Sequence, residues 1–91
     1  MKGSDTFTVR GDLIVEDIDG EYVVVDLEQN EYFGLNEVGR EIWTHLCAGL
    51  SVDDIVAELV RTFEVDAQTA NLDARAFVRD LLEAGLLQAS S

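Results

Sequence analysis

The stretch EYFGLNEVGREIW, residues 31–43, contains the point at which the chain changes from one residue pattern to another. Before Asn36, β-branched and aromatic residues alternate with acids, which is typical of half-buried strands. After Asn36, apolar residues recur at helical spacing, so Ile42 and Trp43 are expected on the buried face of a helix. The Asn36 side chain can cap that helix. The stretch therefore predicts a strand over Glu31–Leu35 followed directly by a helix.

Two further strands are expected before this stretch, at Leu13–Ile18 and Tyr22–Leu27. The pair Asp19-Gly20 between them favours a two-residue type I′ hairpin turn, because both turn positions need a positive φ. The strongly apolar face of the second strand is expected to consist of Val23, Val25 and Leu27. The three strands form an antiparallel meander, to which Phe7–Val9 could add a short fourth strand.

Three helices are expected after the meander, and each has recognisable end signals. The first stops at Gly49, and Ser51 caps the second, with an acid three residues later as in a capping box. The third begins at Asp66 and runs to about Ala84, and Gly85 suits a left-handed C-cap. The sequence thus predicts an α+β fold: a three-stranded antiparallel β-meander followed by three helices, winged-helix-like in order, as a single domain over all 91 residues.

The charge of the chain restricts its partners. Nineteen Asp and Glu residues against six Lys and Arg give a formal net charge of −13. Such a field repels phosphate backbones and anionic lipid, so neither nucleic acid nor a membrane surface is an expected partner. No stretch approaches the roughly 18 apolar residues of a membrane span, and the N-terminus has no apolar run of a signal peptide. We therefore expect a cytoplasmic protein.

The sequence carries no recognisable catalytic or metal-binding set. His45 and Cys47, the only imidazole and thiol, lie two residues apart on a helix and point about 200° from each other. The acids around the hairpin turns, Asp26 among them, are expected to form a solvated surface. No glycine-rich phosphate loop, nucleophile elbow or calcium loop is present. We expect no enzymatic activity, no metal and no cofactor.

The third expected strand, Glu31–Leu35, is the best candidate for a binding site. In a meander it pairs on one side only, which leaves main-chain N–H and C=O groups free on the other. Such edges are normally protected by Lys, Pro or a covering element, and here Glu31 alone protects it. Tyr32 and Phe33 must point to opposite faces, so only one of them can enter the core. Either the third helix covers this edge, or a peptide strand completes it.

The third helix offers two different flanks beside its core face, at about 100° of rotation per residue. One flank combines apolar and basic side chains and consists of Leu72, Arg75, Ala76 and Arg79. The other flank is acidic and consists of Asp66, Asp73 and Asp80. Arg75 and Arg79 could pair with acids of a bound peptide, or serve only as surface charges, with Arg79 paired to Glu83.

Three segments together resemble the PqqD-like family. They are the motif Y-x-x-L-N-x-x-G-x-x-I-W starting at Tyr32, the segment GLSVDDI at residues 49–55, and the ending LLEAGLL at residues 81–87. The resemblance extends from about Leu13 to Leu87. The family consists of leader-peptide recognition elements of ribosomally synthesised, post-translationally modified peptides.

The resemblance implies a non-catalytic function and a binding mode. Members bind the leader of a precursor peptide as an extra strand on the third strand, in a groove walled by the third helix. Here that implies a site formed by Glu31, Tyr32, Phe33, Gly34, Leu35, Leu72, Arg75, Ala76 and Arg79. The motif resembles stand-alone recognition proteins of lasso peptide clusters, whose partners are a leader peptidase and a separate cyclase. Because the sequence starts at Met1 and ends shortly after Leu87, we expect a stand-alone protein.

Two other functions remain open from the sequence. One is that of PqqD itself, which serves a radical enzyme in the biosynthesis of a quinone cofactor. The other is a winged-helix DNA-binding regulator, which the topology permits. The acids on the third helix make it a poor recognition helix, so the regulator is disfavoured.

We predict that the protein does not bind DNA at physiological salt, because a net charge of −13 opposes the counterion release that drives such binding. An electrophoretic mobility shift titration measures this directly. A sequence-specific complex that survives physiological salt would contradict a peptide-recognition function and favour the regulator.

Overall fold

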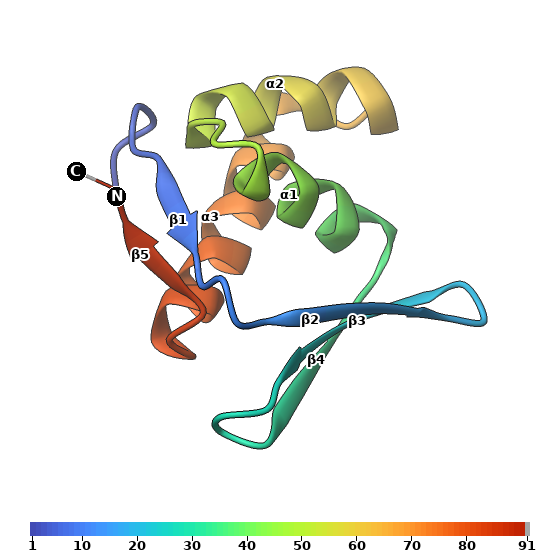
Figure 1. Ribbon diagram of the computed structural model, residues 1–91. Helices are drawn as coiled ribbons and strands as arrows, with labels where there is room; N and C mark the ends of the chain where they lie inside the picture. The colour runs from blue at the N-terminus through green and yellow to red at the C-terminus, as the bar shows by residue number, and fades with distance from the viewer. Residues whose placement is uncertain (91) are drawn as a thin grey trace.

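The computed structural model describes residues 1–90 and confirms an α+β fold, in which an antiparallel meander precedes three helices (Figure 1). Its elements are β1 (Phe7–Val9), β2 (Ile14–Ile18), β3 (Glu21–Asp26), β4 (Glu31–Leu35), α1 (Glu37–Cys47), α2 (Val52–Phe63), α3 (Ala67–Glu83) and β5 (Leu87–Ala89).

Strands β2, β3 and β4 form the predicted meander, in the order β2-β3-β4. The hairpin turn between β2 and β3 has φ values of 53° at Asp19 and 85° at Gly20, as a type I′ turn requires. In the register of the second hairpin, Val24 lies opposite Phe33 and Asp26 lies opposite Glu31. Figure 1 shows the β2–β3 hairpin extending away from the helices as an arm.

The short strand at Phe7–Val9 does not join the meander. It pairs antiparallel with β5 in a separate two-stranded sheet, in which Phe7 lies opposite Ala89 and Val9 opposite Leu87. The sequence did not indicate β5, because this strand depends on pairing with β1 at the other end of the chain. The pairing also places the first strand of the chain beside the last one, as Figure 1 shows.

The helix ends follow the predicted local signals. Asn36, Ser51 and Asp66 each accept a hydrogen bond from the backbone N–H three residues later, at 2.8, 3.2 and 2.7 Å. After α3, Gly85 has a φ of 78°, and the N–H of Leu86 donates to the carbonyl of Leu81 at 3.0 Å. This bond defines a Schellman turn, which directs the chain from α3 straight into β5.

The buried face of β3 differs from the expected one. Val24 and Asp26 are fully buried and Tyr22 is half-buried, whereas Leu27 is 66% exposed. The other expected members, Val23 and Val25, are half-buried on the outer face. Asp26 can lie on the buried face of β3 because its carboxylate accepts hydrogen bonds from Arg10, sixteen residues earlier in the chain. A prediction that places every acidic residue in solvent therefore puts the wrong face of β3 in the core.

The core lies between the three helices and receives side chains from the inner face of the meander and from the β1–β5 ribbon. Trp43 is buried, as predicted. The core consists of Phe7, Val24, Ile42, Trp43, Leu46, Val52, Ile55, Leu59, Ala70, Ala74, Val78, Leu81, Leu86 and Leu87. Within residues 1–90 no helix has the combination of length and apolar character needed to cross a bilayer.

Two leucines on neighbouring helices provide a matched test of this core. Leu59 is 1% exposed and Leu72 is 61% exposed. Leu59→Ala should lower the free energy of unfolding by about 2–5 kcal/mol, because it leaves a cavity in the core. Leu72→Ala should change it by no more than about 0.5 kcal/mol. Urea unfolding followed by circular dichroism measures both, and equal losses would contradict the placement of α2 and α3.

Candidate functional site: an unpaired strand edge beside a cavity

The edge of β4 that faces away from β3 has no strand partner among the described residues. Tyr32 is 77% exposed on the outer face, whereas Phe33 is half-buried and packs against the core. The prediction that these two residues point to opposite faces is therefore confirmed. Backbone N–H and C=O groups on the free side of β4 are available to an added strand.

A cavity of about 330 Å³ begins where β4 ends, between α1 and α3. Asn36, which directly follows β4, lies at its border. Its apolar lining comes from both helices and its acids from α3 alone. The lining residues are Asn36, Val38, Gly39, Ile42, Asp73, Ala76, Phe77 and Asp80.

Gly39 lets α1 approach α3 closely at this cavity. A Cβ atom at Gly39 would lie 3.1 Å from Cε2 of Phe77 and 3.7 Å from Cβ of Leu35. The end of β4, the first turn of α1 and the middle of α3 thus meet at one point. Neither Gly39 nor Phe77 was among the residues predicted for the site. A glycine inside a helix, which costs about 1 kcal/mol relative to alanine, was the signal that could have indicated such a contact.

The four residues of α3 that were predicted for the site do not lie together at the cavity. Only Ala76 lines the cavity. The guanidinium of Arg75 donates to Oδ1 of Asn71 at 2.9 Å and to the carbonyl oxygen of Met1 at 2.7 Å, so it is directed to the N-terminal segment. Leu72 and Arg79 are exposed. The flank of α3 at the cavity is instead the acidic one, since helical periodicity alone cannot tell which flank faces β4.

A second, larger cavity of about 610 Å³ lies on the other side of the α1 N-terminus, near the tip of the β2–β3 hairpin. It is lined by Tyr22, Leu35 and Arg40, among others. The guanidinium carbon of Arg40 lies 4.4 Å from the centre of the Tyr22 ring, a cation–π geometry. This contact ties α1 to the start of β3.

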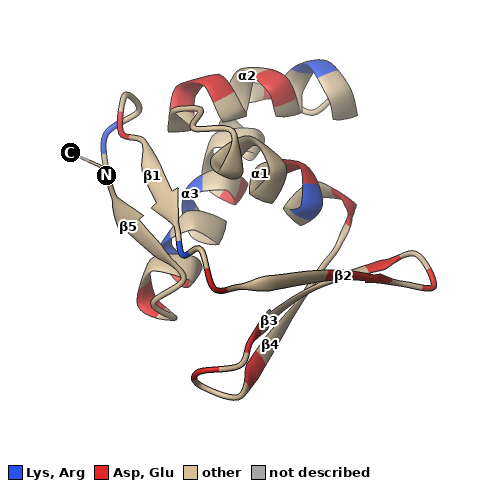
Figure 2. Cartoon of the chain, viewed as in Figure 1, with Lys and Arg blue, Asp and Glu red and all other residues tan. Residues whose placement is uncertain are grey.

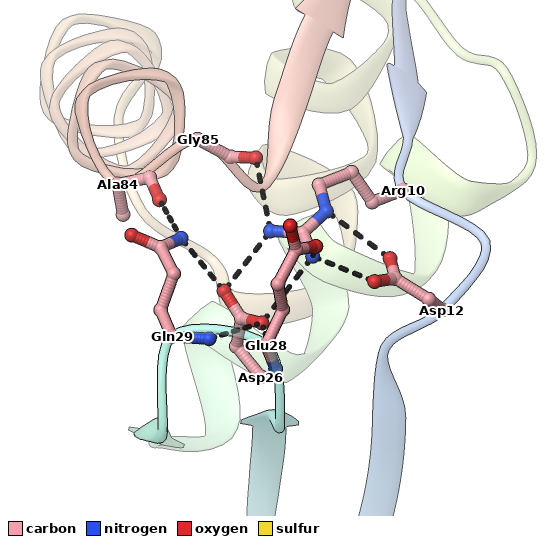
Figure 3. Close-up of polar contacts among 7 residues, drawn as sticks. All are labelled: Arg10, Asp12, Asp26, Glu28, Gln29, Ala84 and Gly85. Carbon is pink, nitrogen blue, oxygen red and sulfur yellow. Dashed lines mark hydrogen bonds and ion pairs between the residues drawn. The ribbon is translucent and has the colours of Figure 1, made fainter.

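A cluster of polar side chains joins the β3–β4 turn to the residues that directly follow α3 (Figure 3). We call it the Arg10 clamp, and it consists of Arg10, Asp12, Asp26, Glu28 and Gln29. Arg10 donates to both carboxylate oxygens of Asp26, at 3.0 and 3.3 Å. It also donates to Asp12 at 2.7 and 3.1 Å and to Glu28 at 2.9 Å. Its remaining contact is the carbonyl oxygen of Gly85, at 3.5 Å.

Gln29 completes the Arg10 clamp from the turn between β3 and β4. Its side-chain amide donates to Asp26 at 2.8 Å and to the carbonyl oxygen of Ala84 at 3.2 Å. The Asp26 carboxylate also accepts the backbone N–H groups of Glu28 and Gln29. Asp26 is 1% exposed, so the expectation that it belongs to a solvated acidic surface is wrong. A buried carboxylate is tolerated here because each of its oxygens is hydrogen-bonded.

The clamp lowers the pKa values of its acids. Desolvation alone would raise the pKa of Asp26, but hydrogen bonds from Arg10 and Gln29 outweigh it, and the net pKa lies below the usual value. The hydrogen bond from Arg10 likewise lowers the pKa of Asp12. The same bonds raise the pKa of Arg10.

The potentially reactive side chains lie outside both the clamp and the cavity. His45 contacts Glu41 on its own helix at 3.3 Å. Cys47 is exposed at the end of α1, and partial burial of its thiol raises the thiol pKa, which leaves less of the nucleophilic thiolate. Across residues 1–90, no three potential metal ligands come together.

The sequence matches the family described as Coenzyme PQQ synthesis protein D (PqqD) over residues 21–87. The chain belongs to the PqqD family. This match spans β3 to the start of β5 and so includes the unpaired strand, the cavity and α3. A comparison with curated proteins found no match.

Two solved structures are similar to this PqqD-family chain along nearly all of its length. One is TbiB1 in complex with the TbiA(beta) leader peptide, with 32% identity, a TM-score of 0.81, and coverage of 92% of this chain and 98% of that one. The other is lasso peptide synthetase B1 complexed with the leader peptide, with 30% identity, a TM-score of 0.82, and coverage of 90% and 96%.

The lowered pKa of Asp26 predicts how the free energy of unfolding depends on pH. A carboxyl with a depressed folded-state pKa stabilises the fold fully above its ordinary pKa of 3.8. That contribution declines as the pH falls below this value and is lost below the folded-state pKa. Urea unfolding from about pH 6 to about pH 2 should therefore show Asp26→Asn converging with the wild type on acidification.

The matched control for this measurement is Asp17→Asn, an exposed acid of β2 in the same meander. Its difference from the wild type should stay small at every pH. A constant gap between Asp26→Asn and the wild type down to the lowest pH would mean that the Asp26 carboxylate contributes nothing through its charge.

Proposed function

We propose that this protein binds the leader segment of a ribosomally synthesised precursor peptide in lasso peptide biosynthesis. The observation that carries the proposal is the unpaired edge of β4 beside a partly apolar cavity. Two similar chains, which match this one over at least 90% of its length, were both solved with a leader peptide bound. The protein would act in the cytoplasm, where ribosomal peptides are made.

In the proposed complex the leader adds as a strand to Glu31–Leu35. Main-chain hydrogen bonds to β4 provide affinity with little dependence on sequence. A leader strand on this edge runs past the end of β4 at Leu35, where the cavity between α1 and α3 opens. An apolar leader side chain can enter there against Ala76 and Phe77, and this contact provides selectivity.

The protein itself carries out no chemistry in this proposal. It delivers the bound precursor to a leader peptidase, and to a cyclase or another modifying enzyme of the pathway. Holding the precursor on a shared assembly raises its effective concentration at the partner enzyme, which is enough to accelerate processing. Incubated alone with a precursor, the protein should leave the precursor mass unchanged.

The alternative is a peptide chaperone for a radical enzyme in quinone cofactor biosynthesis, and the family description favours it. Both functions use the same peptide-binding edge, so the geometry does not separate them. Calorimetric titration with one leader of each pathway does. Tight binding of the quinone-precursor peptide, with none of a lasso leader, would replace the proposed function by this alternative.

Hydrogen exchange tests strand addition directly. On titration with a lasso leader peptide, outward-facing backbone amides of Glu31–Leu35 should gain protection, because they become donors in a new ladder. Amides of β2, which lies on the far edge of the meander, serve as the internal control. Protection that appears in β2 or α2 and spares β4 would show that the leader binds elsewhere.

Two charge-reversal pairs decide which flank of α3 forms the wall of the site. Asp73→Lys with Asp80→Lys alters the flank at the cavity, and Arg75→Glu with Arg79→Glu alters the opposite flank. We expect the first pair to change the dissociation constant of the leader and the second to leave it within about twofold, because Arg75 is directed to the N-terminal segment and Arg79 is exposed outside the cavity. The reverse result would show that the peptide contacts the flank of α3 that carries Leu72, Arg75 and Arg79.

A further inference from the structure

We propose that the Arg10 clamp is the positioning element of the peptide site: it fixes β4 relative to α3 without contacting the peptide. This inference rests on the proposed function for its binding readout. Its structural part, that the clamp sets the geometry of β4, stands independently. Arg10 lies in the connection between β1 and β2, outside the strand edge and outside the cavity.

The clamp fixes the Glu31 end of β4. Asp26, the last residue of β3, lies opposite Glu31, the first residue of β4. Gln29, in the turn that joins the two strands, donates to both Asp26 and the carbonyl oxygen of Ala84 at the C-terminal end of α3. Arg10 adds a second link, because it contacts Asp26 and the carbonyl oxygen of Gly85. The start of β4 is thus attached to the last turn of α3.

The other end of β4 is fixed by apolar packing instead. Leu35 lies against Gly39, and Gly39 lies against Phe77 of α3. Along α3, Phe77 precedes Ala84 by about two turns, so β4 and α3 are attached to each other at two separated places. Phe33 packs against the core between these two places, and the polar attachment at Ala84 fixes the Glu31 end of β4 and with it the angle between the strand and the helix.

This angle matters because an added strand must satisfy two contacts at once. Its backbone must pair along β4, and its side chain must enter the cavity between α1 and α3. If the hydrogen bonds of the clamp are broken part of the time, only a fraction of the protein molecules can make both contacts. The apparent dissociation constant rises in inverse proportion to that fraction, so a competent fraction of one tenth weakens binding about tenfold.

The test compares three clamp variants with one matched surface variant. Arg10→Gln and Asp26→Asn each remove the ion pair, and Arg10→Lys keeps the charge but loses the forked geometry that reaches several acceptors. Arg61→Gln is the control, because Arg61 is an exposed arginine of α2 that pairs with Glu58 outside the clamp. Circular dichroism at the temperature of measurement establishes that each variant is folded.

For a lasso leader peptide we expect the dissociation constant to rise about tenfold for Arg10→Gln and for Asp26→Asn, less for Arg10→Lys, and not at all for Arg61→Gln. Combining Arg10→Gln with Asp26→Asn should weaken binding no further than either change alone, because both open the same clamp. Unchanged affinity in both single variants would overturn the proposal.

A spin-label distance separates positioning from general stabilisation. Labels on cysteines placed at the exposed positions Tyr32 and Leu72, with Cys47→Ser to remove the native thiol, report the separation of β4 and α3 in the free protein. We expect the distance distribution to broaden in Arg10→Gln and Asp26→Asn but not in Arg61→Gln. A distribution that stays as narrow as in the wild type would overturn the proposal even if affinity falls. If the wild type binds no leader, the proposed function fails, and the spin-label result still decides whether the clamp positions β4.

Discussion

The ion pair between Arg10 and the buried Asp26 connects the meander to the β1–β2 connection and to the end of α3. Removing a carboxylate from water is strongly unfavourable unless its oxygens are bonded, and here both oxygens of Asp26 accept hydrogen bonds. The bonds come from the β1–β2 connection and from the β3–β4 turn, which in turn contacts the end of α3. One buried charge therefore holds together segments that are distant in sequence, and it lies with Val24 on the face of β3 that is turned toward the core.

The features that could be predicted from the sequence are those that depend on neighbours in the chain. The type I′ turn at Asp19-Gly20, the three helix caps and the Schellman turn at Gly85 each involve a few consecutive residues, and all were confirmed. The family resemblance, which rests on the motif around Trp43, was confirmed as well. The strand edge at Glu31–Leu35 could be located because strand order in a meander follows chain order.

The features that could not be predicted depend on contacts between distant residues. Asp26 was predicted to be solvated because nothing in the sequence indicates that Arg10, sixteen positions earlier, approaches its carboxylate. β5 exists only because it pairs with β1 at the opposite end of the chain. On α3, periodicity separated the basic from the acidic flank, but only the location of β4 indicates that Asp73 and Asp80 border the cavity. The wrong predictions, which concern Asp26, the buried face of β3 and the pairing of Phe7–Val9, came from missing long-range partners and not from a wrong local preference. Which flank of α3 contacts the peptide stays a prediction.

Charge and geometry together constrain the peptide that this edge can accept. An unpaired strand bonds to any backbone, so β4 alone distinguishes poorly between sequences. Discrimination must come from the cavity, whose apolar lining includes Ile42 and Phe77 and whose α3 side carries two acids. The meander and its turns, residues 14–35, carry seven of the 19 acidic residues and none of the six basic ones (Figure 2). In the proposed complex, a peptide that approaches β4 meets a negative field, which slows acidic segments and draws basic ones, and the fit of one side chain between α1 and α3 then decides whether it stays.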